Sequence, residues 1–180
     1  MTAPIPYAIS NYTDNTIGIL NKISIIFTRR RLNIESINVS ETERLGVSRF
    51  TILVKSDDRR VIEKLVLQIR RIVEVMAVYG YEDQDWVSRE IALYKIVVAS
   101  PDRAAKIAQL AAKSGAAILH SEKHCVVLQK TGTEEEIYAL FGLFKPFGII
   151  EFVRSGKIGL SKKEKGLSEY LPNTEWEYHI

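Results

Sequence analysis

Apolar residues in the first half of the chain follow two different spacings. Apolar side chains three or four positions apart predict a helix over residues 18–30 and a second helix capped by Asp57 or Asp58. The apolar positions of the two helices are Ile19, Leu20, Ile23, Ile26 and Phe27, and then Val61, Ile62, Leu65, Val66 and Ile69. Alternating or continuous apolar runs predict strands at residues 7–11, 34–41, 47–55 and 73–79. The predicted order is strand, helix, strand, strand, helix, strand.

The polar run Glu82-Asp83-Gln84-Asp85 interrupts this pattern, and the same order of elements then repeats. A helix is predicted from Ser100-Pro101-Asp102 to about Lys113, because serine is a good N-cap and proline fits the first turn. The run Thr133-Glu134-Glu135-Glu136 predicts a capped start for another helix. That helix would place Ile137, Leu140, Phe141 and Phe144 on one face. Strands are predicted at residues 90–99, 116–121, 124–130 and 149–153.

We therefore expect an α+β fold of two tandem ferredoxin-like βαββαβ sandwiches, each with two helices on one face of a four-stranded antiparallel sheet. The predicted boundaries are residues 5–81 for the first domain, 82–88 for a linker, 89–156 for the second domain and 157–180 for a short C-terminal tail. The tail is rich in glycine, lysine and glutamate, and is expected to be loosely ordered. The strand at 90–99 has apolar residues in both phases, so we expect its second face to be covered, most simply by self-association.

With 25 basic and 22 acidic residues, the 180-residue chain has a formal net charge of +3. This near balance gives no electrostatic reason to expect nucleic acid as the main partner. The lone Cys125 cannot form a disulfide within the chain, and the N-terminal residues lack the features of a signal peptide. No apolar run approaches the roughly 20 residues of a membrane span. We therefore expect a cytoplasmic protein with no membrane partner.

The turn that precedes the first predicted helix is the strongest candidate for a binding site. Helix N-termini carry unpaired N–H groups and partial positive charge, so the N–H groups of Ile19 and Leu20 could receive a carboxylate. Gly18 has no side chain and would let a small ligand come close. Asn15 and Asn33 offer hydrogen-bond donors and acceptors for the charged ends of an amino acid. The alternative is that Gly18 and Asn33 are ordinary turn residues.

The remaining polar residues do not form a catalytic set, so we expect no enzymatic activity in this chain. His120, His124 and Cys125 have a spacing that could hold a metal, but Cys125 lies in an apolar strand and is more simply a core residue. We therefore expect no metal site. Ser48-Arg49 begins a strand, and the Arg49 side chain is expected to face solvent, with a role at an interface as the alternative.

Several short motifs together carry a resemblance to a known family. In the first half they are Asp14-Asn15, Gly18, Leu20, Asn33-Ile34-Glu35-Ser36 and Ser48-Arg49. In the second half they are Arg89 to Ile96, Ile150 to Gly156, and Gly159-Leu160-Ser161. In this order and spacing, over residues 7 to 162, the chain resembles the small regulatory subunit of acetolactate synthase, whose first domain is an ACT domain.

The resemblance implies a non-catalytic partner of a thiamine-diphosphate enzyme of branched-chain amino acid biosynthesis. Such a chain would stimulate the catalytic large subunit and confer feedback inhibition by valine. It would bind no cofactor itself, while thiamine diphosphate, Mg and FAD are expected in the catalytic partner. The effector, valine or another branched-chain amino acid, would lie between the ACT domains of a homodimer. The residues carried over by position are Asn15, Gly18 and Asn33, with Ile17, Ile19, Leu20 and Ile34 as neighbours.

Two positions depart from the family pattern. Ile17 stands where a small or polar residue is usual, which implies a tighter or shifted pocket. Arg31 stands where glycine is common, and since glycine suits a left-handed helix end, arginine implies a different turn just before Asn33. A stand-alone sensor or transcription regulator that responds to an amino acid or a metal is the alternative function. The sequence has no recognisable DNA-reading element to support it.

Overall fold

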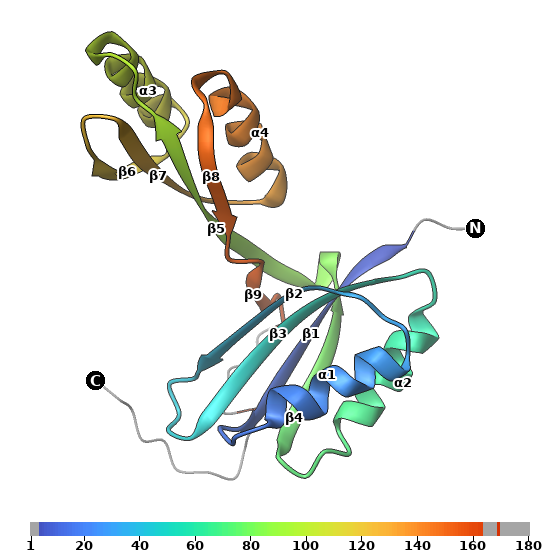
Figure 1. Ribbon diagram of the computed structural model, residues 1–180. Coiled ribbons are helices and arrows are strands. Elements are labelled where there is room, and N and C mark those ends of the chain that lie inside the picture. Colours follow the sequence, from blue (N-terminus) through green and yellow to red (C-terminus); the bar gives the residue numbers. More distant parts are fainter. Residues whose placement is uncertain (1–3, 164–168, 170–180) are drawn as a thin grey trace. The chain divides into compact units, whose positions relative to one another are not determined.

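The chain divides into two structural units. The structure, a computed structural model, describes residues 4–163 and residue 169 (Figure 1). The first unit comprises the described residues up to Val87 together with those from Ile158 onward, and the second unit spans Ser88–Lys157. The first unit is therefore built from two separate stretches of the sequence.

The first unit contains a four-stranded antiparallel sheet in the order β2-β3-β1-β4, with two helices on one face (Figure 1). Its elements are β1 (Ile5–Asp14), α1 (Ile19–Arg29), β2 (Ile34–Glu41), β3 (Val47–Ser56), α2 (Arg59–Ile69) and β4 (Val75–Glu82). The order of elements and the strand order are those of a ferredoxin-like sandwich.

The predicted apolar stripes of both helices form the core of the first unit. Helix α1 buries Ile19, Ile23 and Phe27, and helix α2 buries Ile62, Leu65 and Ile69. They pack on the face of the sheet that carries Ile9 and Ile52, which are paired across β1 and β3. The apolar stripes of the two helices and the apolar side chains on one face of the strands therefore pack together in a single layer.

The second unit repeats this topology with the strand order β6-β7-β5-β8. Its elements are β5 (Trp86–Val97), α3 (Pro101–Lys113), β6 (Ala117–Ser121), β7 (Cys125–Gly132), α4 (Glu134–Phe144), η2 (Lys145–Phe147) and β8 (Ile149–Arg154). Helix α3 is capped by the Ser100 hydroxyl, and Thr133 and Glu136 form the predicted capping box of α4. The expectation of an α+β fold with two βαββαβ units is confirmed.

The connection between β4 and β5 is more ordered than a linker. The predicted linker, residues 82–88, contains a short 3-10 helix, η1 (Asp83–Asp85), and the first residues of β5. The Trp86 indole N–H donates to the Asp83 carboxylate at 3.3 Å, and the Trp86 side chain is buried. This stretch is therefore part of the first unit's packing.

A short strand, β9 (Ile158–Ser161), pairs with β5 and belongs to the first unit. The expectation of a loosely ordered tail is wrong for these four residues, because side chains distant in sequence hold them. The Arg49 guanidinium donates to the Gly159 carbonyl oxygen at 2.6 Å, and Lys162 Nζ donates to the Gln84 carbonyl oxygen at 2.8 Å. The predicted tail beyond residue 163, apart from residue 169, lies outside the described residues.

Arg49 lies on the face of the first sheet opposite the helices and does not simply face solvent. Besides the Gly159 carbonyl, its guanidinium donates to the Ser10 hydroxyl at 3.0 Å and lies over the Tyr12 ring at 5.6 Å. Ser10, Tyr12 and Thr51 on the same face are all buried. The expectation of a solvent-facing arginine is therefore wrong, since β9 lies against it.

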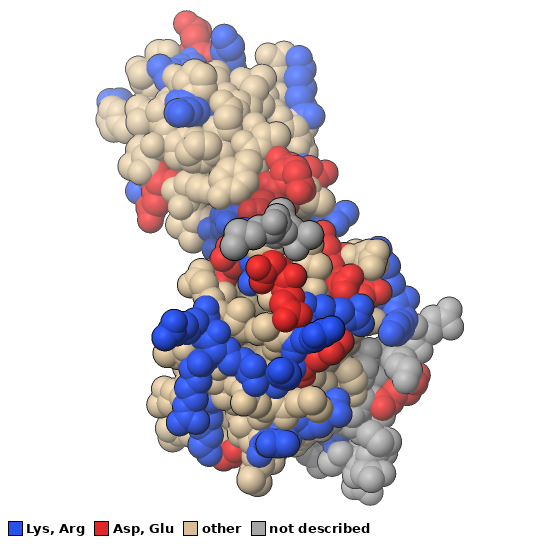
Figure 2. All heavy atoms as spheres, turned by 90° about the vertical axis from the view of Figure 1, so that its right-hand side faces the viewer, with Lys and Arg blue, Asp and Glu red and all other residues tan. Residues whose placement is uncertain are grey.

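The surface and the helices add two general observations. Lys and Arg side chains are prominent on the surface of the first unit (Figure 2). Within the described part of the chain, no helix combines the length and the apolar character needed to cross a membrane.

Candidate functional site

The turn between β1 and α1 ends at Gly18 and is open to solvent. Gly18 is the residue before the helix and has φ +85°, a left-handed conformation in which side chains are strained. A Cβ at Gly18 would meet nothing within 4 Å, so the space beside it is open. No side chain among the described residues caps the helix start. The open turn leaves room for an external acceptor of helix N–H groups.

Backbone hydrogen bonds hold this turn in place. The Asn15 N–H donates to the Gly46 carbonyl oxygen at 2.8 Å, which ties the turn to the hairpin between β2 and β3. The Ile19 N–H makes a long bond of 3.4 Å to the Thr16 carbonyl oxygen, so it is only weakly engaged. The Asn15 side chain is exposed. The turn is thus rigid while its polar groups remain accessible.

The other candidate, Asn33, lies just beyond the opposite end of α1. It is exposed, and its side-chain amide donates to the Glu35 carboxylate at 3.2 Å. This hydrogen bond, followed by one from Lys55, lowers the pKa of Glu35. Arg31, in the turn before it, has φ +56°, which is left-handed. The expectation of a different turn is therefore wrong, because Arg31 adopts the conformation that glycine favours.

The candidate residues form two groups that α1 separates. Asn15 and Gly18 precede the helix, and Asn33 follows it. A helix of 11 residues is about 16 Å long at roughly 1.5 Å per residue. One small ligand therefore cannot touch both groups within a single chain. A site made of all three residues needs the turn of one chain and Asn33 of another.

The four apolar neighbours differ in what they can contact. The Ile19 side chain is 5% exposed in the core, and Ile34 packs against the same core. Ile17 is fully exposed and Leu20 is 46% exposed. Ile17 and Leu20 are therefore the apolar side chains available at the turn, whereas Ile19 offers its backbone.

Two hollows in the described part of the chain contain none of the predicted site residues. One, of about 340 Å³, lies beside α2 and β4 in the first unit and is lined by Tyr7, Arg59, Ile62, Glu63, Val66, Leu67, Gly80, Tyr81, Glu82 and Asp85. Arg59 makes ion pairs with Glu63 and Glu82 at its rim, both at 3.2 Å. Sequence reasoning gave no signal for this hollow, because its lining comes from four separate elements.

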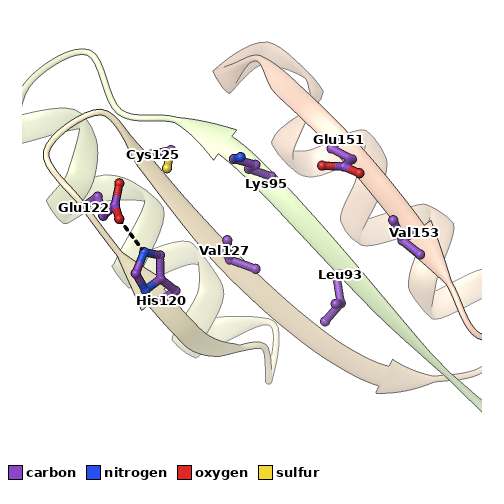
Figure 3. Close-up of a pocket in the computed structure, with 8 residues that line it drawn as sticks. All are labelled: Leu93, Lys95, His120, Glu122, Cys125, Val127, Glu151 and Val153. Carbon is purple, nitrogen blue, oxygen red and sulfur yellow. Dashed lines mark hydrogen bonds and ion pairs between the residues drawn. The ribbon is translucent and has the colours of Figure 1, made fainter.

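The second hollow, of about 360 Å³, lies on the helix-free face of the second sheet. Figure 3 shows its lining side chains projecting from neighbouring strands, with Lys95 on β5 beside Glu151 on β8. The His120 ring lies 2.9 Å from the Glu122 carboxylate. No group of three or more His, Cys, Asp or Glu side chains arranged for a metal occurs among the described residues.

Buried ionisable groups elsewhere have structural explanations. Burial, followed by the charge of Glu90, raises the pKa of Tyr94 to about 12. The Tyr94 hydroxyl donates to the Ile137 carbonyl oxygen at 2.8 Å in the second core. Glu90, which is 2% exposed, pairs with Arg154 at 3.2 Å. These groups tie elements of the second unit together.

Comparisons with known proteins agree across both units. Residues 9–77 match a model described as an AHAS small subunit-like ACT domain, where AHAS is acetohydroxyacid synthase, another name for acetolactate synthase. Residues 89–163 match a model described as the small subunit of acetolactate synthase. The first match lies within the first βαββαβ unit, and the second covers nearly all of the second unit together with β9.

Individual relatives support the same assignment. The acetolactate synthase small subunit of Bacillus subtilis is 36% identical over 82% of this chain and 86% of its own length. That of Aquifex aeolicus is 33% identical over 86% of this chain and 80% of its own length. The crystal structure of the Thermotoga maritima small subunit matches with a TM-score of 0.80 and 28% identity, over 89% of this chain and 99% of that one. These relatives are small subunits and not catalytic chains. The chain therefore belongs to the family of acetolactate synthase small subunits.

Proposed function

We propose that this chain is the regulatory subunit of a cytoplasmic acetolactate synthase, which stimulates the catalytic large subunit and makes it sensitive to valine. The catalytic chain would hold thiamine diphosphate, Mg and FAD, and this chain would bind no cofactor. Family membership over both units supports the partnership. The alternative of a stand-alone sensor has no comparable support.

The effector site we propose lies between two copies of the first unit. The observation that carries it is the separation of Asn15 and Gly18 from Asn33 by the length of α1. In a homodimer related by a two-fold axis, α1 of one chain can run antiparallel to α1 of the other. The turn of one chain would then meet Asn33 of its partner, so each effector would contact both chains.

The chemistry of the proposed site suits a free amino acid. The effector carboxylate would approach Gly18 and the first N–H groups of α1, where the helix dipole favours negative charge. Asn33 would hydrogen-bond the ammonium group, and Ile17 would lie beside the aliphatic side chain. One methylene changes binding by only about 1–3 kcal/mol in an apolar pocket. We therefore expect valine to be preferred over leucine and isoleucine without excluding them.

A synthase assay tests this proposal. The purified catalytic subunit is assayed with and without this chain across a valine titration. We expect higher activity with the chain, and inhibition by valine only when the chain is present. Unchanged activity in the presence of the chain would contradict the proposed function. Stimulation without a response to valine would contradict the effector site alone.

A matched pair of variants locates the site. Asp and Asn both tolerate left-handed backbone better than most residues, and they differ mainly in charge. Gly18→Asp should abolish the valine response and leave stimulation largely intact, because its carboxylate would occupy the position of the effector carboxylate. Gly18→Asn should retain more of the response. If Gly18→Asp stays fully valine-sensitive, the pocket lies elsewhere.

A further inference from the structure

Helix α2 carries an exposed row of side chains that the effector site does not use. Arg60, Lys64, Leu67 and Arg71, here called the α2 stripe, are spaced four, three and four residues apart and so lie on one side of the helix and its following turn. All four are exposed, and Leu67 is 55% exposed between two of the cations. The stripe is thus an apolar side chain flanked by positive charge.

Two of the charges of the stripe, those of Arg60 and Lys64, oppose the stability of the helix that carries them. Helix α2 begins with two arginines and has no acidic residue in its first turn, although the positive end of the helix dipole disfavours cations there. Arg60 and Lys64 are like charges four residues apart, which is also unfavourable. Arg59 is compensated by Glu63 and Glu82. Within the described part of the chain, Arg60, Lys64 and Arg71 form no ion pair.

Neighbouring cations extend the positive surface. Arg29, Arg30 and Arg31 lie at the end of α1, and the Arg30 guanidinium contacts the Gln68 side chain of α2 at 2.7 Å. Lys and Arg are correspondingly prominent on the first unit in Figure 2. Because the whole chain carries a formal charge of only +3, this concentration is local.

We propose that the α2 stripe docks onto an acidic surface of the catalytic subunit, an inference that rests on the proposed function. An apolar side chain within a cationic border is typical of protein interfaces, in which arginine is enriched. A nucleic acid backbone fits less well, because it offers no apolar contact for the exposed Leu67 and the whole chain has a formal net charge of only +3. The partner surface should therefore present carboxylates around an apolar contact for Leu67.

One substitution separates docking from a structural role. Arg60→Glu puts an acid in the first turn of α2 and creates a favourable pair with Lys64, so the isolated chain should become more heat-stable. The same change should weaken binding to the catalytic subunit roughly tenfold, with a shallower dependence on salt than the wild type. Affinity is measured by titration calorimetry at two salt concentrations, and stability by thermal unfolding. If Arg60 had only a structural role, its replacement would not raise the stability of the chain while lowering its affinity for the catalytic subunit.

A control variant tests whether location or net charge matters. Lys106→Glu makes the same change in charge on an exposed position of α3 in the second unit. It should leave affinity for the catalytic subunit within about twofold of the wild type. Leu67→Ser should weaken binding without changing its salt dependence, because it removes the apolar contact alone.

The possible outcomes are distinguishable. If the wild type binds the catalytic subunit and Arg60→Glu binds equally well, docking through the stripe is overturned while the proposed function stands. Equal losses in Arg60→Glu and Lys106→Glu would overturn it in favour of a general charge effect. Binding of the wild type to duplex DNA that Arg60→Glu abolishes would overturn it in favour of a nucleic acid site. Absence of any complex between the wild type and the catalytic subunit would overturn the proposed function as well.

Discussion

The two units share one topology but treat the helix-free faces of their sheets differently. In the first unit this face contains buried Ser10, Tyr12 and Thr51, and Arg49 connects it to β9. In the second unit the corresponding face leaves Leu93 and Val97 each 37% exposed. Two sheets with the same strand order can therefore differ in how far their helix-free face is covered.

The interiors differ as well. The second core is apolar, and its buried tyrosine, Tyr94, donates a hydrogen bond to a backbone carbonyl. The first unit buries Asn11 and Thr13 completely, and their side-chain polar atoms have no hydrogen-bond partner among the described residues. Unpaired buried polar atoms reduce stability. The first unit has thus kept unpaired polar groups at the end of β1 nearest the candidate turn, whereas Tyr94 and the buried Glu90 of the second unit have partners.

The largest expected effect comes from a substitution that displaces β9 from the first unit. A Cβ at Gly159 would clash with the Trp86 ring and would approach the Val87 carbonyl oxygen to 2.5 Å, which is too close for any real contact. Gly159→Ala should therefore displace β9 and destabilise the first unit by about 3 kcal/mol, as measured by chemical denaturation. In the second unit Gly142 lies in α4 with open space around it. Gly142→Ala should stabilise by about 1 kcal/mol, since alanine favours helix. Equal effects of the two variants would contradict this reading.

An intermediate effect tests the arginine that holds β9. Arg49→Met retains most of the apolar side chain and removes the hydrogen bonds to Ser10 and Gly159, so we expect a loss of about 2 kcal/mol. Hydrogen exchange should also become faster at β9. Lys95→Met, on the helix-free face of the second sheet, is the matched control and should change stability by less than about 0.5 kcal/mol. A comparable loss in both variants would mean that Arg49 has no special role.

The smallest expected effect concerns the buried Thr13 hydroxyl of the first unit. Thr13→Val keeps the shape of the side chain and removes an unpaired polar atom, so it should stabilise the chain by about 1 kcal/mol in thermal or chemical unfolding. Thr131→Val, at an exposed position of β7, should change stability by less than about 0.5 kcal/mol. Destabilisation by Thr13→Val would show that the hydroxyl has a partner in solution.

Local patterns predicted most of the fold. The stripes of α1 and α2 and the capping box of α4 follow from spacing within short segments, and the ferredoxin-like strand order was inferred from the βαββαβ order of the elements. The open turn at Gly18 was equally visible, because glycine and asparagine mark such turns. The separation of Asn15 from Asn33 also follows from the helix between them.

Contacts between distant residues were not predictable in this way. Arg49 holds Gly159 across 110 positions of sequence, so the composition of the tail gave no sign of a strand. Arg31 adopts a left-handed conformation that its type disfavours, because the end of α1 and the start of β2 fix the turn around it. The α2 stripe was not predicted from the sequence, because it is defined by which side chains of α2 remain exposed once the helix has packed on the sheet.

The first unit combines two separate stretches of the chain, and this affects when the unit can complete its folding during translation. During translation the residues up to Val87 leave the ribosome well before Ile158, so this unit remains incomplete until nearly the whole described chain has been synthesised. A nascent polypeptide ending at Lys157 would contain the elements from β1 to β8 but would lack the Gly159 carbonyl oxygen that accepts from Arg49. Cutting the chain after Val87, where the first stretch of this unit ends, would therefore produce an N-terminal fragment that lacks β9.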